Sequence, residues 1–348
     1  MEYRPLGRTG VQVSAACLGA WQFGNRATQE ESEAILNTAL DRGVNFIDTS
    51  NVYGGGVGDS EQILGRALSA RGDRDRLIMA TKVFFPADPE DPNGRGVSRK
   101  HIIRECENSL RRLQTDYIDL YYLHRLDPRF PVDEPLRALD DLIRSGKVRY
   151  VGTSTAAAWQ MVEALWVSKE LGLNRFIADT PPYNILDRRI EREFVPMAQT
   201  FGIAINPWAP VGGSLLTGIY TRGQAPPSDS RLADPQFATT TAARMNERVY
   251  DVGDAIANIG EKYEKSSAAV AFAWVMSQPG ITSPIIGPEK LSDLTDTLTA
   301  LDIKLTDDDL ASIDEVAPPG GMISSFYDSN TEGVIGVNQF MAHPYRVF

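Results

Sequence analysis

The sequence has 348 residues, 42% of them hydrophobic and 23% charged, a composition typical of a water-soluble globular protein with a large core. Its net charge of −11 disfavours nucleic acids and anionic lipid surfaces as partners. The N-terminal residues are too polar for a signal peptide, and no apolar run reaches the roughly 20 residues of a membrane-spanning helix. The two cysteines, Cys17 and Cys106, are far apart, so we expect a reducing, cytoplasmic setting without membrane insertion.

Strand-like runs of β-branched and aromatic residues recur along the chain, and stretches with helical periodicity lie between them. A short hairpin is expected first, within residues 1–14. The eight strands that follow are predicted at Ala15–Gly19, Val44–Thr49, Leu77–Lys82, Tyr117–His124, Val148–Ser154, Phe176–Thr180, Ile203–Trp208 and Ser283–Gly287. The helices are predicted at Thr28–Arg42, Ser60–Ala70, Ser98–Leu113, Asp133–Ser145, Ala156–Leu171, Arg188–Phe201 and Met245–Lys262.

Eight strands that alternate with helices pair in parallel through crossover connections, and the closed form of that α/β architecture is the (β/α)8 TIM barrel. A doubly wound sheet would usually carry G-x-G-x-x-G after its first strand, and no such loop follows Ala15–Gly19. We therefore predict one barrel domain over residues 1–348, with an N-terminal β-hairpin in residues 1–14. A long loop is expected after strand seven, and a C-terminal tail over residues 318–348.

Four polar residues stand at or just past the C-terminal ends of predicted strands: Asp48, Tyr53, Lys82 and His124. In a parallel barrel, the C-terminal ends of all strands lie at the same end of the barrel, and the active site lies there. A phenol with a pKa near ~10 becomes a better acid when a cation lowers that pKa by about 1–3 units. We expect Lys82 to be that cation and Asp48 to be the carboxylate that keeps it charged. Each residue alone is more often structural than catalytic, but their joint placement predicts an enzyme that protonates a carbonyl oxygen.

The sequence resembles the aldo-keto reductase family, in the branch that also contains the voltage-gated potassium channel β-subunits. The matching segments span nearly the whole chain in family order. They are residues 6–14 (LGRTGVQVS), 18–21 (LGAW), 46–54 (FIDTSNVYG), 80–82 (ATK), 116–124 (DYIDLYYLH), 146–154 (GKVRYVGTS), 207–218 (PWAPVGGSLLTG) and 284–287 (PIIG).

This resemblance implies an NAD(P)H-dependent reductase of aldehydes or ketones, which also runs in reverse as an alcohol dehydrogenase. Tyr53 would be the general acid as hydride arrives from the nicotinamide, His124 would orient the carbonyl, and Trp21 would wall the substrate pocket. The alternative is a cofactor-sensing binding or regulatory subunit with vestigial reductase activity. The aromatic C-terminal tail suggests a lid, an oligomer contact or passive packing on the barrel. We expect no metal site.

The resemblance assigns cofactor binding to the later strands and loops. Ser154 would bind the nicotinamide carboxamide, Trp208 would stack on the nicotinamide ring, and the loop at 211–218 would wrap the pyrophosphate with backbone N–H groups. The cofactor-binding residues expected in that loop are Gly212, Gly213, Ser214, Leu216 and Gly218.

Several positions depart from the family pattern. Thr155 and Thr180 replace the Asn and Gln that usually bind the carboxamide. After strand eight, the remaining expected cofactor residues are Gly287, Glu289, Lys290 and Asp293. Carboxylates there repel a 2′-phosphate and can accept a hydrogen bond from a ribose 2′-hydroxyl. Because Lys290 can pair with the phosphate, we expect NADPH as the cofactor, with NADH as the alternative.

Overall fold

The computed structural model describes residues 1–324, so most of the predicted C-terminal tail, with its expected role, lies outside the described residues. The described chain divides into two compact units. The first comprises Met1–Pro181, Met197–Asn206 and Thr282–Leu294, and the second comprises Pro182–Pro196, Pro207–Ile281 and the chain from Thr295. The single domain expected from the sequence stays a prediction.

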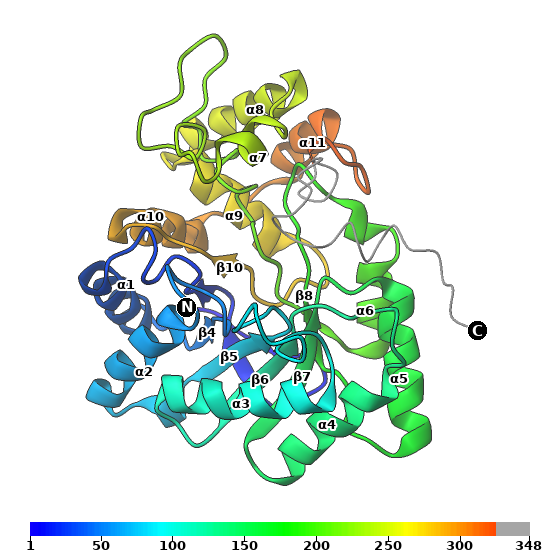
Figure 1. The fold of residues 1–348 in the computed structure, drawn as a ribbon. Helices are drawn as coiled ribbons and strands as arrows, with labels where there is room; N and C mark the ends of the chain where they lie inside the picture. Colours follow the sequence, from blue (N-terminus) through cyan, green and yellow to red (C-terminus); the bar gives the residue numbers. More distant parts are fainter. Residues whose placement is uncertain (325–348) are drawn as a thin grey trace. The chain divides into compact units, whose positions relative to one another are not determined.

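Eight parallel strands form one sheet in the first unit (Figure 1). The order is β10-β3-β4-β5-β6-β7-β8-β9, so the last strand in the chain pairs with the first of the eight. The bounds are β3 Cys17–Gly19, β4 Phe46–Asp48, β5 Ile78–Val83, β6 Ile118–Leu123, β7 Val148–Ser154, β8 Ala178–Thr180, β9 Ala204–Ile205 and β10 Ile285–Ile286. All eight predicted strands are present. Six are shorter than predicted because pairing ends before the apolar runs do, β7 matches its predicted bounds, and β5 is shifted by one residue.

Backbone hydrogen bonds join the two edges of this sheet. The Thr282 N–H, which leads into β10, donates to the Ile205 carbonyl of β9 at 2.8 Å. The side chains of two non-adjacent strands also meet, since Asn206 donates to the Tyr122 hydroxyl at 3.0 Å. Gly152 leaves room for that tyrosine, because a Cβ there would lie 2.7 Å from its ring. These contacts confirm the predicted barrel architecture.

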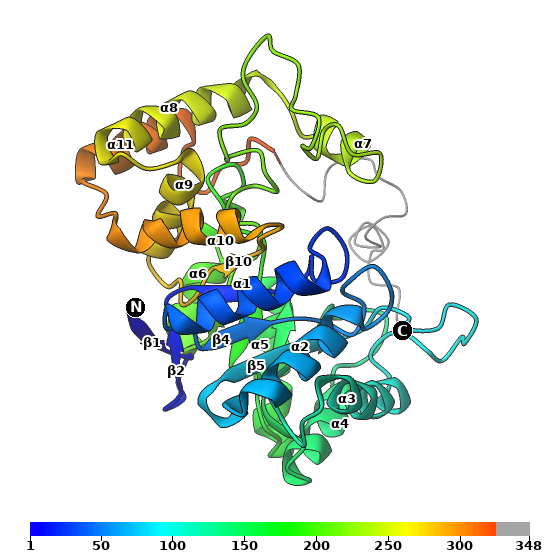
Figure 2. The same cartoon turned by 90° about the vertical axis from the view of Figure 1, so that its left-hand side faces the viewer.

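Helices of the first unit pack outside the strands (Figure 2). Their bounds are α1 Gln29–Asp41, α2 Asp59–Arg71, α3 Arg99–Leu113, α4 Asp133–Arg144 and α5 Ala158–Leu171, with the 3-10 turn η1 at Arg74–Arg76. Polar caps fix where two of them begin: the Thr28 hydroxyl accepts from the Glu31 N–H, and the Ser98 hydroxyl accepts from the His101 N–H. The five helices predicted here are confirmed, with small shifts at their ends.

The predicted helix at Arg188–Phe201 is wrong in its first half. A 3-10 turn, η2 at Arg189–Glu191, comes first, and α6 covers only Phe194–Phe201. Pro196 explains the late start, because proline fits the first turn of a helix but clashes with the preceding turn in a helix interior.

The second unit is helical, with α7 Ala238–Ala242, α8 Glu247–Tyr263, α9 Ser267–Ser277 and α11 Asp307–Val316. α10 Leu291–Thr297 begins in the first unit, and η3 Leu298–Asp302 follows it. The long loop predicted after strand seven is present and is interrupted only by α7. Among residues 1–324, no helix has both the length and the apolar character needed to cross a bilayer.

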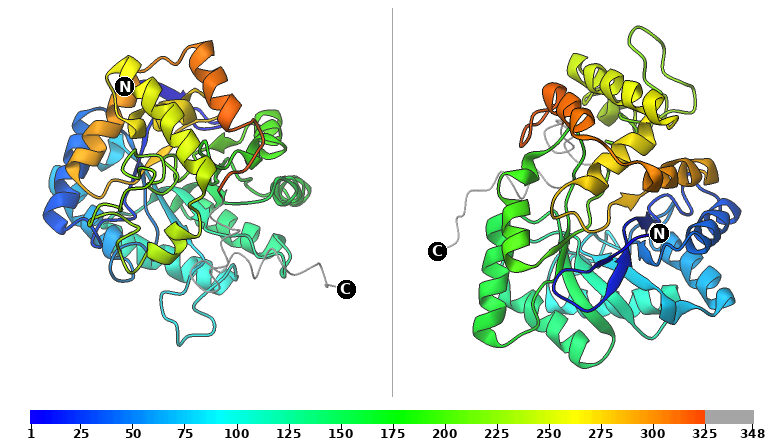
Figure 3. Two further views of the ribbon diagram at one scale, coloured as in Figure 1. Left: turned by 90° about the horizontal axis from the view of Figure 1, so that it is seen from above. Right: turned by 180° about the vertical axis from the view of Figure 1, so that it is seen from behind.

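The N-terminal hairpin covers the end of the barrel at which strands begin (Figure 3, right). Strands β1 Tyr3–Pro5 and β2 Gln12–Ser14 pair antiparallel, as predicted. The turn between them has Gly7 at φ +60°, and a Cβ there would lie 2.7 Å from the carbonyl oxygen of Ile177 and 2.8 Å from that of Gly202. Both residues lead into strands, so the hairpin packs against the end of the barrel at which the strands begin.

We expect Gly65→Ala to destabilise the first unit by about 1–3 kcal/mol, because overpacking forces backbone shifts. Gly65 lies in α2 against the last turn of α3, where a Cβ would contact the Arg112 carbonyl and lie 2.8 Å from the Leu113 carbonyl carbon. Urea unfolding followed by circular dichroism measures the change.

The matched control is Gly253→Ala in the middle of α8, where an added Cβ meets nothing within 4 Å. It should stabilise the protein by about 0.5–1 kcal/mol, the usual gain in a helix interior. Equal effects of the two substitutions would contradict the close approach of α2 and α3.

Candidate active site

The strand register brings the four predicted catalytic residues to one end of the barrel. Asp48 is the last residue of β4, Lys82 is the second-last residue of β5, and His124 follows β6. β4 pairs with β5, and β5 pairs with β6, so these residues end three neighbouring strands. Tyr53 lies in the loop that leaves β4.

Lys82 and Asp48 form a buried ion pair. The Lys82 ammonium donates to Asp48 Oδ1 and, at 2.8 Å, to the Thr49 carbonyl. The two side chains are only 3% and 5% exposed. Burial would lower the pKa of Lys82, but Asp48 and then Tyr53 outweigh it and raise that pKa above its ordinary value. Lys82 is therefore a permanent ammonium at neutral pH.

Tyr53 lies between this ammonium and the histidine. Lys82 Nζ is 4.7 Å from the centre of the Tyr53 ring, and the Tyr53 hydroxyl is 3.4 Å from His124 Nε2. Burial raises the pKa of Tyr53, and the charge of Lys82 offsets only part of that rise. The prediction that Lys82 brings the pKa of Tyr53 below its usual value is therefore wrong for the protein alone. Desolvation destabilises the phenolate more than the charge of Lys82 stabilises it.

His124 is a buried, neutral imidazole. Burial, followed by the charges of Arg125 and Lys82, lowers its pKa well below the ordinary value. Its Nδ1 is 3.3 Å from the Ser50 hydroxyl, and its ring meets the Phe85 ring edge-on, with 4.9 Å between centroids. A neutral imidazole donates through one nitrogen and accepts through the other, so it can orient a carbonyl oxygen.

Sequence reasoning missed three residues of this cluster: Ser50, Phe85 and Arg125. Each follows a predicted strand, as the four recognised residues do, so position alone could have indicated them. The Arg125 guanidinium donates to the His124 carbonyl at 2.5 Å and to the Ser154 hydroxyl at 3.3 Å. It therefore links the proposed acid cluster to the first expected cofactor residue.

Ser154, Thr155 and Thr180 meet at the ends of β7 and β8. The Ser154 hydroxyl donates to the Thr180 carbonyl at 3.1 Å, while the Thr180 hydroxyl is buried and has no hydrogen-bond partner in the described protein. Thr155 has φ +57°, a strained conformation for a β-branched residue and one that is typical of functional sites. The orphaned hydroxyl fits a polar ligand group such as a carboxamide.

The loop at 211–218, in the second unit, contains a run of backbone in the left-handed region. Gly212, Gly213 and Ser214 have successive φ values of +65°, +66° and +77°, and Gly218 has φ +82°. Within residues 1–324, the N–H groups of Gly213, Ser214 and Leu215 have no hydrogen-bond partner. Three adjacent free N–H groups in such a turn fit a phosphate.

Two other expected residues of the second unit, Leu216 and Trp208, make backbone hydrogen bonds within that unit. The Leu216 N–H donates to the Val211 carbonyl at 3.1 Å, and its side chain is fully buried. The Trp208 backbone carbonyl accepts from the Tyr183 N–H at 3.3 Å. Their expected roles toward a cofactor stay predictions.

A cavity of about 410 Å³ lies beside the residues that follow β10. Glu289 forms an ion pair with Arg26 at 2.7 Å and accepts from Gln22 at 3.4 Å. Asp293 accepts the N–H groups of Glu289 and Lys290, each at 3.0 Å, so that carboxylate oxygen holds the loop. A Cβ at Gly287 would meet nothing within 4 Å. The cavity is lined by Arg26, Thr28, Glu31, Glu289, Lys290 and Ser292.

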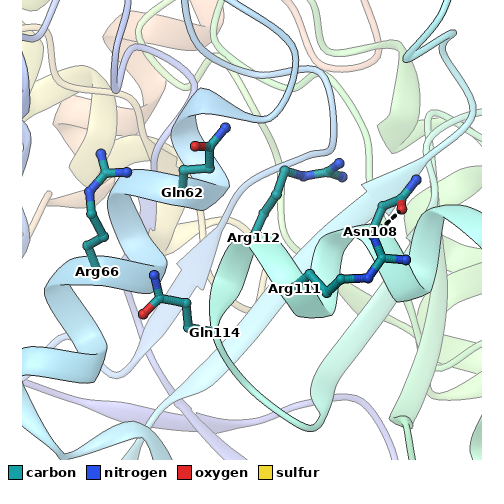
Figure 4. A pocket seen from close by; sticks show the side chains of 6 residues that line it. All are labelled: Gln62, Arg66, Asn108, Arg111, Arg112 and Gln114. Carbon is teal, nitrogen blue, oxygen red and sulfur yellow. Dashed lines mark hydrogen bonds between the residues drawn. The ribbon is translucent and has the colours of Figure 1, made fainter.

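A separate polar cleft of about 260 Å³ lies between α2 and α3 (Figure 4). Its Arg112 is engaged with Glu61 at 2.6 Å, and its Arg111 donates to Asn108 at 2.9 Å. The cleft is lined by Gln62, Arg66, Asn108, Arg111, Arg112 and Gln114. These residues belong to outer helices and include none of the expected site residues.

The comparison with protein families matches residues 15–318 to the model described as "Aldo/keto reductase family". The chain belongs to the aldo/keto reductase family. This confirms the predicted family and the predicted class of enzyme, an oxidoreductase of a family that typically depends on NAD(P)H.

Three relatives cover nearly the whole chain. An "Uncharacterized oxidoreductase YrpG" from Bacillus subtilis is 37% identical over 94% of this chain and 99% of the relative. A "Probable voltage-gated potassium channel subunit beta" from Oryza sativa is 36% identical over 87% of this chain and 92% of the relative. A "Versiconal hemiacetal acetate reductase" from Aspergillus parasiticus is 32% identical over 92% of this chain and 98% of the relative. The chain is therefore similar both to reductases and to proteins named as channel subunits.

We expect Lys82→Met to cost about 3–5 kcal/mol of stability, because it leaves the Asp48 carboxylate buried without its partner. The double variant Asp48→Asn with Lys82→Met should be less destabilised than Lys82→Met alone. Urea unfolding of the three proteins measures both effects. As a control, Lys147→Met removes a half-exposed pair with Glu107 and should cost about 0–1 kcal/mol. A double variant that is no more stable than Lys82→Met alone would contradict the ion pair.

Proposed function

We propose that this protein reduces an aldehyde or ketone with NADPH or NADH, and oxidises the corresponding alcohol in the reverse direction. One observation carries the proposal: the Lys82 ammonium lies 4.7 Å from the Tyr53 ring, and the Tyr53 hydroxyl is 3.4 Å from His124. This arrangement joins a proton donor, a charge that stabilises its conjugate base and a second hydrogen-bonding group.

In the proposed mechanism, the substrate oxygen accepts hydrogen bonds from the Tyr53 hydroxyl and from His124. The reduced nicotinamide supplies the hydride to the carbonyl carbon. As negative charge grows on the oxygen, Tyr53 transfers its proton there, and the phenolate that remains is stabilised by the Lys82 ammonium. Asp48 keeps Lys82 charged and fixed. Reverse transfer of the same proton supports alcohol oxidation.

Two groups of residues, each argued within its own unit, support the proposal of such a cofactor. We assign the carboxamide to Ser154, Thr155 and Thr180, where the Thr180 hydroxyl has no partner in the described protein. We assign the pyrophosphate to the free N–H groups of the loop at 211–218. These assignments add to the role of Trp208 expected from the family resemblance.

The alternative function is a cofactor-sensing subunit with vestigial activity. It is favoured by the relatives named as channel β-subunits. The complete set of Asp48, Tyr53, Lys82 and His124 favours turnover instead, because a sensor needs no acid that is aligned for proton transfer.

Small carbonyl compounds are the proposed partners, and Trp21, which is 38% exposed after β3, is proposed to contact them. The possible oligomer and the cytoplasmic location stay predictions. In the first unit, α5 exposes Trp159, Val162 and Trp166 along one face, which is where we expect a subunit contact.

Tyr53→Phe should lower kcat for carbonyl reduction by about 10²–10⁴-fold, because it removes the proton donor. In the unaltered protein, the rate should stay flat through neutral pH and fall only above pH ~10, since the pKa of Tyr53 is raised and its protonated form is the active one. Single-turnover oxidation of the reduced nicotinamide, with a panel of aldehydes and ketones, measures both.

The control is Tyr3→Phe, which alters a half-exposed phenol in β1 and should leave the rate unchanged. Cofactor binding without turnover of any carbonyl would support the sensing subunit. Full activity of Tyr53→Phe would remove the proposed mechanism.

Glu289→Gln should increase the affinity for NADPH relative to NADH by about tenfold, because it removes a carboxylate near the proposed 2′-phosphate position and releases Arg26. Calorimetric titration of the protein with both cofactors gives the ratio. Glu30→Gln removes an equal charge from an exposed position of α1 and should leave the ratio unchanged. If the ratio of NADPH to NADH affinity is unchanged in Glu289→Gln, the 2′-phosphate of the cofactor does not bind near Glu289.

A further inference from the structure

The Arg125 side chain is a buried cation beside the proposed catalytic histidine. Only 8% of the residue is exposed. Its guanidinium donates to the His124 carbonyl at 2.5 Å and to the Ser154 hydroxyl at 3.3 Å, and its Cζ is 5.8 Å from the centre of the Phe85 ring. Arg125 thus contacts the backbone of the proposed catalytic histidine and the side chain of the first expected cofactor residue, Ser154.

No carboxylate among residues 1–324 forms an ion pair with Arg125, and its Nε is buried without a hydrogen-bond partner. Asp127, two residues along, is instead paired with Arg129 through both carboxylate oxygens. Asp179 accepts from the Thr153 hydroxyl and the Ala156 N–H. The guanidinium therefore keeps unused donors in a buried position.

The other nearby charges do not neutralise it. Burial raises the pKa of Asp179 to about 7, even though Arg125 acts to lower it, so that carboxyl is only partly ionised at neutral pH. The ion pair of Lys82 with Asp48 is neutral as a whole. An unpaired buried charge is costly, and such charges concentrate at binding sites where a ligand completes them.

We propose that Arg125 binds an acidic group, a carboxylate or a phosphate, on the carbonyl substrate. The inference rests on the proposed reductase function and narrows its substrate class. A guanidinium presents a planar fork of N–H donors that matches the oxygens of either anion.

The acidic group is expected to lie close to the reacting carbonyl, because the Arg125 guanidinium itself donates to the His124 backbone carbonyl at 2.5 Å. Phe85 packs edge-on against the His124 ring, and the centre of its ring is 5.8 Å from Arg125 Cζ, so the three side chains are neighbours and favour a short, partly apolar substrate. Small oxo acids and phosphorylated small aldehydes meet this requirement.

A different role for Arg125 would give a different signature. If its hydrogen bond to Ser154 served only to position that hydroxyl, its removal would impair every substrate equally. Binding of a substrate anion instead changes the ratio of kcat/KM between a charged substrate and its neutral counterpart, mainly through KM.

The test compares matched substrates: succinic semialdehyde with butanal, 2-carboxybenzaldehyde with benzaldehyde, and glyceraldehyde 3-phosphate with glyceraldehyde. For at least one pair, kcat/KM of the unaltered protein should be about 10–100-fold higher for the acidic member, as expected of a charge-assisted pair. Arg125→Met should bring that ratio close to one, and Arg125→Lys should keep part of it. The pair that responds distinguishes a carboxylate from a phosphate.

Arg129→Met is the matched control, because it removes the same charge from the same loop but from a guanidinium already paired with Asp127. It should leave the ratio unchanged. Equal kcat/KM for both members of every pair, or an equal loss for both members in Arg125→Met, would overturn the inference while leaving the reductase function intact.

Calorimetry provides a readout without turnover. Butyrate should bind the unaltered protein, alone or saturated with oxidised cofactor, at least about tenfold more tightly than butyramide, and Arg125→Met should abolish that difference. If no carbonyl is reduced, the reductase function fails, and butyrate binding still decides the role of Arg125. Equal binding of the two probes would then exclude an anion site.

Discussion

The buried ion pair of Lys82 with Asp48 is the interaction on which the arrangement of the site depends. Each charge alone would be too costly at the mouth of the barrel, but together they hold an ammonium beside the Tyr53 ring. The pair also bridges two neighbouring strands, so the sheet that positions it is stabilised by it in turn. Loss of either partner would affect both the fold and the proposed proton transfer, because the same pair stabilises the strand ends and holds the ammonium beside Tyr53.

Desolvation sets the protonation states around this pair. Burial raises the pKa of Tyr53 and lowers that of His124, so both are neutral at physiological pH, as the proposed proton donor and the proposed orienting group must be. Lys82 remains charged because Asp48 outweighs its desolvation. Arg125 adds a second buried cation without a carboxylate of its own, and the resulting excess of positive charge favours a substrate that brings a negative one.

The two ends of the barrel are used differently. The hairpin with Gly7 closes the end where the strands begin, through contacts too close for any side chain. At the other end, the strands stop early and their last residues carry polar groups, several of them without partners in the described protein, such as the Thr180 hydroxyl and Arg125 Nε. Unsatisfied buried groups are costly in a stable core, and here they mark the surfaces that ligands are proposed to complete.

The sequence by itself determined the family, the order of eight strands and which residues stand together at the strand ends as the proposed acid cluster, because apolar alternation, family motifs and the position of Asp48, Lys82 and His124 are local features. It could not give the strand bounds or the late start of α6, which depend on pairing and packing. Only the tertiary structure decided the direction of the pKa of Tyr53 and the unpaired state of Arg125, because both depend on which groups from distant strands share a buried volume, and that cannot be read from spacing along the chain.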